Sequence, residues 1–295
     1  MPSMREMRVP VDREKLLAFA IPAGRQTLTP RDVAFYALSI GMGQQALDAS
    51  ELRYVDPVQG PEVMPAMVLV LAHPGFWLAH PDSGVDPKMV LHGSQDFEIL
   101  APIPTHGEVR STSRVTGLSD KGEGKAAIIF SDTDLFDESG TRFARMNRTI
   151  FVRNGGGCGS FGETNVTATP APEGAPDIVL DLPTRPEQAL YYRLNGDFNP
   201  LHSDSALATR LGFQRPILHG LCTMGVIAHA LLRCLADHDS GRLHGMSLRF
   251  SAPVLPGETI RTEIWNSGQF RARAVERDVV VADQGFVTIL PAGAV

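Results

Sequence analysis

The sequence predicts an α+β fold in which a helix wrapped by a curved antiparallel sheet is built twice. Three observations predict it: a segment poor in large apolar residues divides the chain, short motifs occur in the same order on both sides of it, and alternating apolar and polar runs follow those motifs. Alternation with a period of two is typical of strands with one buried face. The 295 residues suffice for two cores of ordinary domain size.

The dividing segment is rich in Gly, Ala, Pro and Thr, a composition typical of linkers. We therefore predict an N-terminal domain at residues 1–153, a linker at residues 154–177 and a C-terminal domain at residues 178–295.

Three short motifs recur in both domains. The first copy reads Leu91-His92-Gly93, Ala101-Pro102-Ile103 and Gly107-Glu108, and the second reads Leu243-His244-Gly245, Ala252-Pro253-Val254 and Gly257-Glu258. One match could arise by chance, but three in the same order indicate a duplicated fold.

Strands are predicted after the motifs, separated by Gly, Asp and Asn clusters as in an antiparallel meander. They lie at residues 109–115, 126–136, 142–152, 259–265, 270–276 and 279–289. Helices are predicted before the motifs. Thr29-Pro30-Arg31-Asp32 and Thr184-Arg185-Pro186-Glu187 are typical helix starts. The helix at residues 221–236 is apolar over too wide a surface for one solvated face, so we expect the sheet to wrap it.

The composition excludes several classes of protein. The chain has 27 Lys and Arg against 33 Asp and Glu, a net charge of −6, which argues against a nucleic-acid partner. The longest apolar run, residues 66–72, is far shorter than the roughly 20 residues of a membrane span. Residues 1–6 show no signal peptide, and three cysteines without C-x-x-C spacing predict neither a disulfide framework nor a zinc knuckle. We expect a cytoplasmic protein.

The densest polar motif runs from Tyr191 to Asp204, with a turn at Gly196. Asp197, Asn199 and His202 lie on one tight loop, where a carboxylate and an imidazole can share a water, with Asn199 holding that water in line. The alternative is that Asp197 and Asn199 only cap turns, which both residue types do well.

The second motif is Pro216-Ile217-Leu218-His219-Gly220-Leu221. Gly220 is placed where the long helix begins, so its N–H is an unpaired donor able to polarise a thioester carbonyl. The alternative is a glycine needed only for tight entry into the helix. His202, Asp204 and His219 lack tight metal-ligand spacing, so we predict no metal.

Both motifs resemble the MaoC-like (R)-specific enoyl-CoA hydratase 2 family. The N-terminal half is similar too, through Pro30-Arg31-Asp32-Val33-Ala34, Val90-Leu91-His92-Gly93, Asp120-Lys121-Gly122 and Gly155-Gly156-Gly157. The resemblance implies a double hot-dog fold, with catalysis in the C-terminal copy and the acyl chain accommodated by the N-terminal copy.

The resemblance also implies roles for single residues. Asp197 and His202 match the catalytic pair, Asn199 the residue that supports the water, and the Gly220 amide the oxyanion donor. The positions that match acyl-CoA contacts are His92, Gly93, Lys121, Asp197, Phe198, Asn199, Pro200, Leu201, His202, Gly220 and Phe250.

The implied activity is that of a hydro-lyase of fatty-acid metabolism and β-oxidation, which converts trans-2-enoyl-CoA reversibly into (3R)-3-hydroxyacyl-CoA. It implies no cofactor, because coenzyme A is part of the substrate. The resemblance also implies a homodimer. Two alternatives stay open: a dehydratase acting on acyl-carrier-protein thioesters, and a hot-dog acyl-CoA binder or thioesterase without hydration activity.

Overall fold

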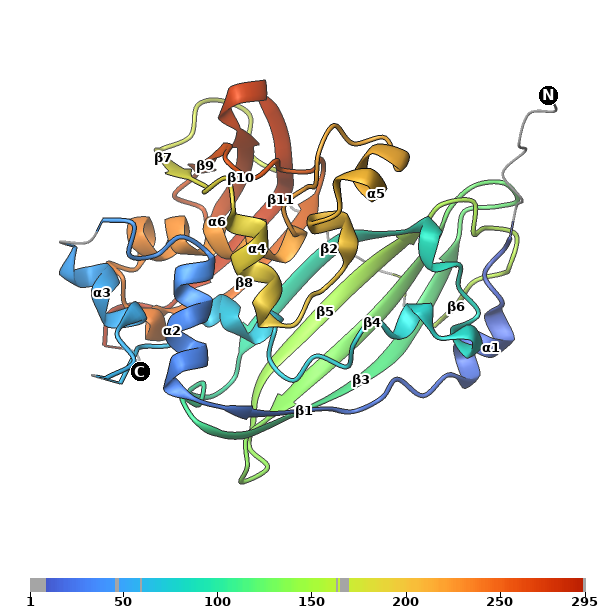
Figure 1. The fold of residues 1–295 in the computed structure, drawn as a ribbon, viewed down its shortest axis with the longest axis horizontal. Helices are drawn as coiled ribbons and strands as arrows, with labels where there is room; N and C mark the ends of the chain where they lie inside the picture. Colours follow the sequence, from blue (N-terminus) through green and yellow to red (C-terminus); the bar gives the residue numbers. More distant parts are fainter. Residues whose placement is uncertain (1–8, 46–47, 59, 163, 165–169, 294–295) are drawn as a thin grey trace.

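One antiparallel sheet of eleven strands runs through both halves of the chain (Figure 1). The structure is a computed structural model that describes residues 9–45, 48–58, 60–162, 164 and 170–293. Each predicted strand is confirmed; β3 continues five residues beyond its predicted end, and the other ends differ by at most two residues. The strands are β1 (Gly24–Leu28), β2 (Val90–Ile99), β3 (Gly107–Asp120), β4 (Ala127–Phe136), β5 (Arg142–Val152), β6 (Phe161–Gly162), β7 (Ile178–Pro183), β8 (Leu243–Phe250), β9 (Thr259–Ile264), β10 (Gln269–Ala274) and β11 (Val279–Ile289).

The strand order confirms the duplication. It is β1-β3-β4-β5-β2-β8-β11-β10-β9-β7, with β6 paired to β3 beside this path. From the middle outward, β2, β5, β4, β3 and β1 of the first half have their counterparts in β8, β11, β10, β9 and β7 of the second. The repeated Leu-His-Gly motifs lie in β2 and β8, which pair antiparallel with Phe97 opposite Met246. The two copies therefore join edge to edge.

The long helix predicted in the second half is α6 (Gly220–Leu235). Every residue from Cys222 to Leu232 is buried, so the helix is covered all round, as its wide apolar surface predicts. Strands β7, β8 and β9 contact it, and so does the 3-10 helix Pro65–Leu69 of the first half.

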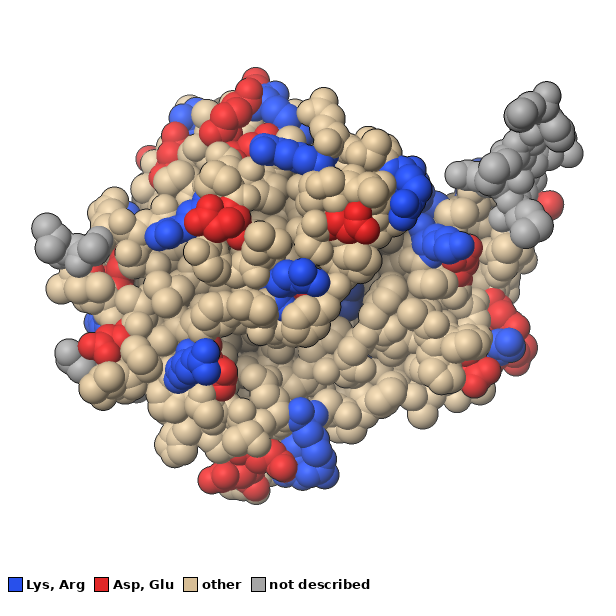
Figure 2. All heavy atoms as spheres, in the orientation of Figure 1, with Lys and Arg blue, Asp and Glu red and all other residues tan. Residues whose placement is uncertain are grey.

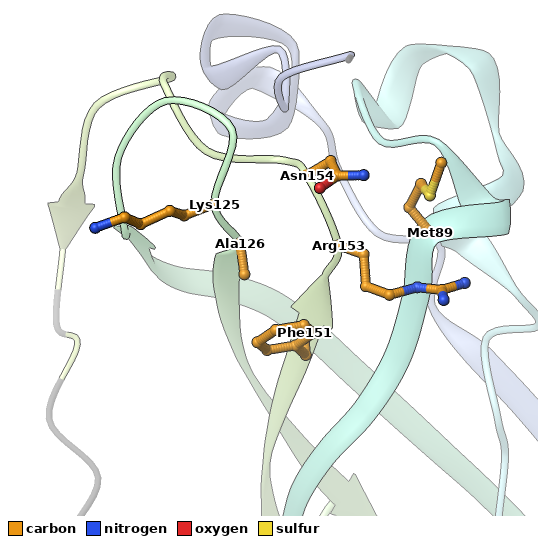
Figure 3. A pocket seen from close by; sticks show the side chains of 6 residues that line it. All are labelled: Met89, Lys125, Ala126, Phe151, Arg153 and Asn154. Atoms are coloured by element: carbon orange, nitrogen blue, oxygen red, sulfur yellow. The ribbon is translucent and has the colours of Figure 1, made fainter. Parts of the chain in front are cut away.

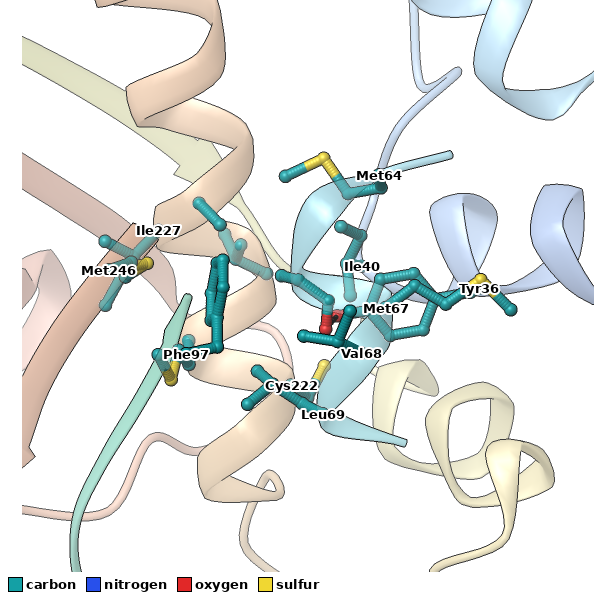
Figure 4. Packing of buried hydrophobic residues seen from close by; sticks show 14 of the residues in the cluster. Tyr36, Ile40, Met64, Met67, Val68, Leu69, Phe97, Cys222, Ile227 and Met246 are labelled. Atoms are coloured by element: carbon teal, nitrogen blue, oxygen red, sulfur yellow. Dashed lines mark hydrogen bonds between the residues drawn. The ribbon is translucent and has the colours of Figure 1, made fainter. Parts of the chain in front are cut away.

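The core between the halves is tightly packed around α6 (Figure 4). Figure 4 shows Cys222 of the helix beside Leu69 of the first half, and Ile227 on the side of Phe97 and Met246. Gly225 lies against α2 (Pro30–Ser39), where an added Cβ would stand only 2.5 Å from Cγ2 of Ile40. A glycine is therefore required for the close approach of α6 and α2.

The first half contains no helix as long as α6 within its described residues. Helix α2 begins with the predicted capping box of Thr29 and Asp32. It is followed by α3 (Ala49–Val55) and four 3-10 helices before β2. Pro57, Pro61 and Pro65 interrupt this segment, and proline lacks the N–H that a helix interior needs. The expectation of a long wrapped helix in each half therefore holds for the second half and is wrong for the first.

A smaller apolar cluster lies apart from the core around α6, in the N-terminal half. There α1 (Arg13–Ala18) contributes Leu16, which is fully buried, and the sheet contributes Ile150. Trp77 completes this cluster from a 3-10 helix. The inner face of the first sheet is thus apolar at this end.

The second predicted capping box is wrong. Helix α4 (Gln188–Tyr192) begins four residues after Thr184, and its N-cap Glu187 makes no capping bond through its side chain. The Thr184 hydroxyl instead donates to the carbonyl oxygen of Glu258 at 2.7 Å. The threonine thus fastens the chain to the sheet rather than starting a helix.

The start of the predicted linker is attached to the first half. The Gly156 amide donates to the Lys125 carbonyl at 3.0 Å, and β6 pairs with β3. Residues 163 and 165–169 of the linker, like residues 1–8, lie outside the described residues. The boundaries at 153/154 and 177/178 stay a prediction.

A membrane-crossing helix is absent from the described ranges, where each helix falls short in length or apolarity.

Candidate active site

The predicted polar loop connects α4 to α5 (Ser205–Arg210). It turns at Gly196, whose φ of 114° lies in the left-handed region that favours glycine. Oδ1 of Asp197 accepts the amide of Asn199 at 3.1 Å, and Oδ1 of Asn199 accepts the amide of Leu201 at 3.0 Å. Both side chains therefore cap turns, as the alternative interpretation held. Asp197 keeps its second carboxylate oxygen for other contacts.

His202 is buried, with 8% of its surface exposed. Its Nδ1 lies 2.8 Å from the carbonyl oxygen of Ile217, and because a carbonyl only accepts, Nδ1 carries the proton. Nε2 is then the proton-accepting nitrogen. Burial lowers the pKa of His202 below its ordinary value, which keeps the ring neutral at pH 7.

His219 holds the two sequence motifs together. Its ring stacks on that of His202 with centroids 3.7 Å apart, and its Nε2 donates to the carbonyl oxygen of Asp197 at 3.2 Å. Burial and the neighbouring His202 lower the pKa of His219 to about 3. Its Nδ1 is buried without a hydrogen-bond partner. Sequence analysis had not chosen His219 as a site residue.

Asp197, His202 and His219 converge on one small volume. Each offers one carboxylate oxygen or ring nitrogen, and these three atoms lie within 4.8 Å of one another. Asp204 is not part of this group, because its carboxylate caps α5 through the amides of Ala206 and Leu207. The arrangement can hold a water between a carboxylate and a neutral imidazole, and its donor set is also one that divalent metals accept.

Gly220 is the first residue of α6, as predicted, so its amide has no acceptor within the helix. A Cβ at this position would stand 3.3 Å from the ring of Phe250. The glycine thus leaves open a narrow approach to the positive end of the helix dipole. That approach lies one residue from His219.

Phe250 connects Gly220 to the first half. The His92 ring meets it edge-on, with centroids 4.8 Å apart. Burial and the positive charge of Arg148 hold the pKa of His92 well below its ordinary value. Its Nε2 is buried and has no hydrogen-bond partner in the structure. The predicted residues His92, Gly220 and Phe250 are therefore brought together with the polar loop.

Gly93 has a packing reason of its own. A Cβ there would stand 2.7 Å from the Thr149 hydroxyl, so β2 and β5 can approach only because the residue is glycine. Among the other loop residues, Phe198 is 60% exposed with the Arg193 guanidinium 5.5 Å from its ring centre, Pro200 is exposed and Leu201 is half-buried.

Lys121 lies on the turn between β3 and β4, exposed to solvent. Its neighbour Asp120 organises this turn by accepting the amides of Gly122, Gly157 and Gly159 at 2.7–2.8 Å. These hydrogen bonds lower the pKa of the Asp120 carboxyl. The glycine-rich stretch is thereby fixed beside the lysine.

A surface pocket opens beside the same turn (Figure 3). Its lining residues are Met89, Lys125, Ala126, Phe151, Arg153 and Asn154, and in Figure 3 the side chains of Lys125 and Arg153 extend in opposite directions. Such a surface suits a phosphorylated nucleotide.

Two further residues facing the site were missed by sequence analysis. Arg148 of β5 interacts electrostatically with Asp197 and with His73. Although His73 keeps an exposed surface, the protein around its ring and the charge of Arg148 lower its pKa to about 4. The only signal in the sequence is the alternation of β5, which places Arg148 on the same face as apolar Met146 and Ile150.

Comparison with known proteins finds the same organisation. Residues 27–154 match the MFE-2 hydratase 2 N-terminal domain, and residues 167–285 match the MaoC like domain. The peroxisomal enoyl-CoA hydratase 2 of Arabidopsis thaliana is 38% identical over 293 residues, which cover 93% of this chain and 94% of that protein.

Solved structures agree. A MaoC-like dehydratase from Phytophthora capsici superposes with a TM-score of 0.82 at 31% identity, covering 95% of this chain and 99% of that one. A Mycobacterium tuberculosis protein described as having a double hotdog fold superposes with a TM-score of 0.58 at 16% identity, over 92% and 94% of the two chains, which supports the fold alone. The chain has a double hot-dog fold and belongs to the enoyl-CoA hydratase 2 family, with a MaoC-like domain in its second half.

Proposed function

We propose that the protein adds water reversibly to the double bond of a trans-2-enoyl-CoA and forms the (3R)-3-hydroxyacyl-CoA. One observation carries this proposal: the bond from Nδ1 of His202 to Ile217 leaves Nε2 free to accept a proton, beside the Asp197 carboxylate. The hydratase 2 relative at 38% identity supports the choice of substrate and of reaction.

The Asp197–His202 pair moves the protons of this reaction. Water loses a proton to the pair, its oxygen bonds to C3, and C2 gains a proton from the pair, so the pair is unchanged after one turnover. The neutral state of His202 suits proton uptake, because a protonated ring has no free lone pair. His219 is a positioning residue in this scheme, since it stacks on His202 and fixes the backbone of Asp197.

The start of α6 stabilises the charge that develops on the thioester oxygen. Attack at C3 moves electrons toward that oxygen, and an amide fixed at a helix N-terminus stabilises the resulting enolate. We assign this role to Gly220, with Phe250 and His92 continuing the binding surface toward the first half.

The nucleotide end of coenzyme A binds at the turn that carries Lys121. The pocket of Figure 3 adds Lys125 and Arg153 for phosphate groups and Phe151 for a flat ring. In this arrangement Oδ1 of Asn199 accepts the Leu201 amide and so fixes the shape of the loop. Its side-chain nitrogen stays available to contact the water.

The scheme uses neither a cofactor nor a metal, because the pair supplies the acid and the base and coenzyme A arrives with the substrate. We further propose a homodimer in the cytoplasm. The free thiols of Cys158, Cys222 and Cys234 support a reducing compartment. Light scattering on the purified protein tests the dimer, and cell fractionation tests the location.

The test of the reaction is the ultraviolet absorbance of the enoyl thioester on mixing with the protein. Trans-2-enoyl-CoAs of short, medium and long chain are offered, and the product is then given to dehydrogenases specific for the R or the S alcohol. We expect loss of absorbance and an R product. An S product contradicts the proposed stereochemistry, and activity only with acyl-carrier-protein thioesters assigns the protein to the dehydratase alternative.

A further inference from the structure

Arg148 lies on the inner face of the first sheet. In β5 the side chains of Met146 and Ile150, two residues away on either side, point to that face and are buried. The arginine pairs in register with Gln95 of β2 and with Ser131 of β4. It is therefore a charged side chain flanked by two apolar residues along its own strand and by two polar residues across the sheet.

This guanidinium forms no salt bridge with a described residue, although the charge of Asp197 acts on it. Its Nε is buried without a hydrogen bond, and none of the ion pairs between described residues includes it. Arg145 of the same strand is different, since it points outward and pairs with Asp134 at 3.1 Å. A charge without a salt bridge in a partly buried position is costly, and an anionic group on a ligand would offset that cost.

The arginine faces the proposed reaction site. Its charge acts on Asp197 and lowers the pKa values of His73 and His92. Figure 2 shows a hollow on this face, below the gold segment that joins α4 to α5 in Figure 1, with blue Lys or Arg atoms in its depth. Both imidazoles are neutral at pH 7, so the positive charge among these three residues is that of Arg148.

We propose that Arg148 binds a carboxylate carried by the acyl group, so that the enzyme hydrates enoyl-CoA thioesters whose chain bears a second acid group. This inference rests on the proposed function and names its substrate class. The phosphates of coenzyme A are separated from the thioester by the long neutral pantetheine arm, which places them away from this residue. A guanidinium and a carboxylate form two parallel charge-assisted hydrogen bonds, which gives both affinity and orientation.

The test compares two substrates of equal chain length, a trans-2-enoyl-CoA that ends in a carboxylate and one that ends in a methyl group. We expect the wild type to prefer the carboxylate in kcat/KM, and Arg148→Met to reduce that preference about ten- to hundredfold. Arg148→Lys keeps the charge and retains part of the preference. Arg145→Met, on the outer face of the same strand, is the matched control and leaves it unchanged.

Several outcomes would overturn the inference. A wild type that does not prefer the carboxylate contradicts it, and so does an equal loss on both substrates in Arg148→Met, which would assign the arginine to the electrostatic support of Asp197. Thermal unfolding checks that the variant folds. If no CoA thioester is hydrated, the proposed function fails, and calorimetric binding of the two thioesters to wild type and Arg148→Met still decides whether Arg148 recognises the carboxylate.

Discussion

The two halves of this molecule share one strand order and differ in what lies against it. The second half keeps the long helix α6 and the polar loop of Asp197 and His202, whereas the first half has short 3-10 helices and α3 in the corresponding stretch of chain. The sheet depends on the alternation of apolar and polar residues, which survives many substitutions. The proposed chemistry depends on the loop of Asp197 and His202 and on the start of α6. The comparison teaches that a fold can be duplicated while the residues of the proposed reaction centre, Asp197 and His202, lie in one copy.

The largest expected effect comes from removing the pair that we propose transfers the protons. Asp197→Asn or His202→Gln should lower kcat for enoyl-CoA hydration by roughly 10²- to 10⁴-fold, because either change removes a group that moves a proton. Stopped or continuous ultraviolet assays measure it. The control is Asp204→Asn, which keeps an accepting oxygen for the cap of α5 and leaves kcat near the wild-type value. A first half able to catalyse would leave the two site variants active.

The substitution Gly225→Ala tests the packing of α6, from the second half, against α2, from the first half. Alanine usually favours a helix over glycine by about 1 kcal/mol, but here its Cβ would meet Ile40 at 2.5 Å in the packed core. We expect a loss of about 2 kcal/mol in the free energy of unfolding, measured with urea. A stability gain would mean that α6 and α2 pack less closely than described.

The buried imidazole of His219, in the second half, predicts that the stability of the fold depends on pH. The pKa of His219 is about 3 when folded, so as the pH falls below about 6.5 the unfolded chain binds a proton that the folded protein excludes. Stability is therefore full above that pH and is lost progressively below it. His219→Phe should reduce the loss between pH 7 and pH 5 by about 2 kcal/mol.

Urea unfolding at these two pH values measures the effect. The control is His244→Phe, because His244 keeps about a third of its side chain exposed. An unchanged slope in His219→Phe would contradict the assignment of a neutral, buried ring at this position.

The smallest expected effect is a change in KM that distinguishes His92 from His244, the histidines of the two Leu-His-Gly motifs. His92 faces Phe250, whereas His244 lies 3.8 Å from Glu98 on the surface. His92→Ala should raise KM for the CoA substrate about threefold to fivefold, in line with the loss of one ring contact. His244→Ala should leave KM unchanged. Equal effects would mean that the duplication preserved function as well as fold.

Most of the sheet could be predicted because alternation is local information. The capping box at Thr29 was also readable, since Asp32 completes it within one turn. Its counterpart at Thr184 could not be read correctly, because the hydroxyl bonds to Glu258, which is distant in sequence. Among its described residues the first half lacks a long helix because several prolines interrupt it, and the helical periodicity after Pro30 does not reveal their combined effect.

The candidate site was predictable where its residues are neighbours in sequence. Asp197 and His202 share one loop, and Gly220 begins a helix whose apolar pattern is plain. His219 was missed as a positioning residue because its stack on His202 forms only when the loop folds against α6. Arg148 was missed for the same reason, since its neighbours come from other strands and loops.

The antiparallel pairing of β2 with β8 has a consequence for how mutations act on the two halves. The mirrored strand order around it is that of two identical chains related by a two-fold axis, here joined into one. In a symmetric dimer every substitution occurs in both subunits at once. In this chain a mutation changes one half only. The first half can therefore specialise in recognising the acyl group, while the second half keeps the proposed acid and base, Asp197 and His202.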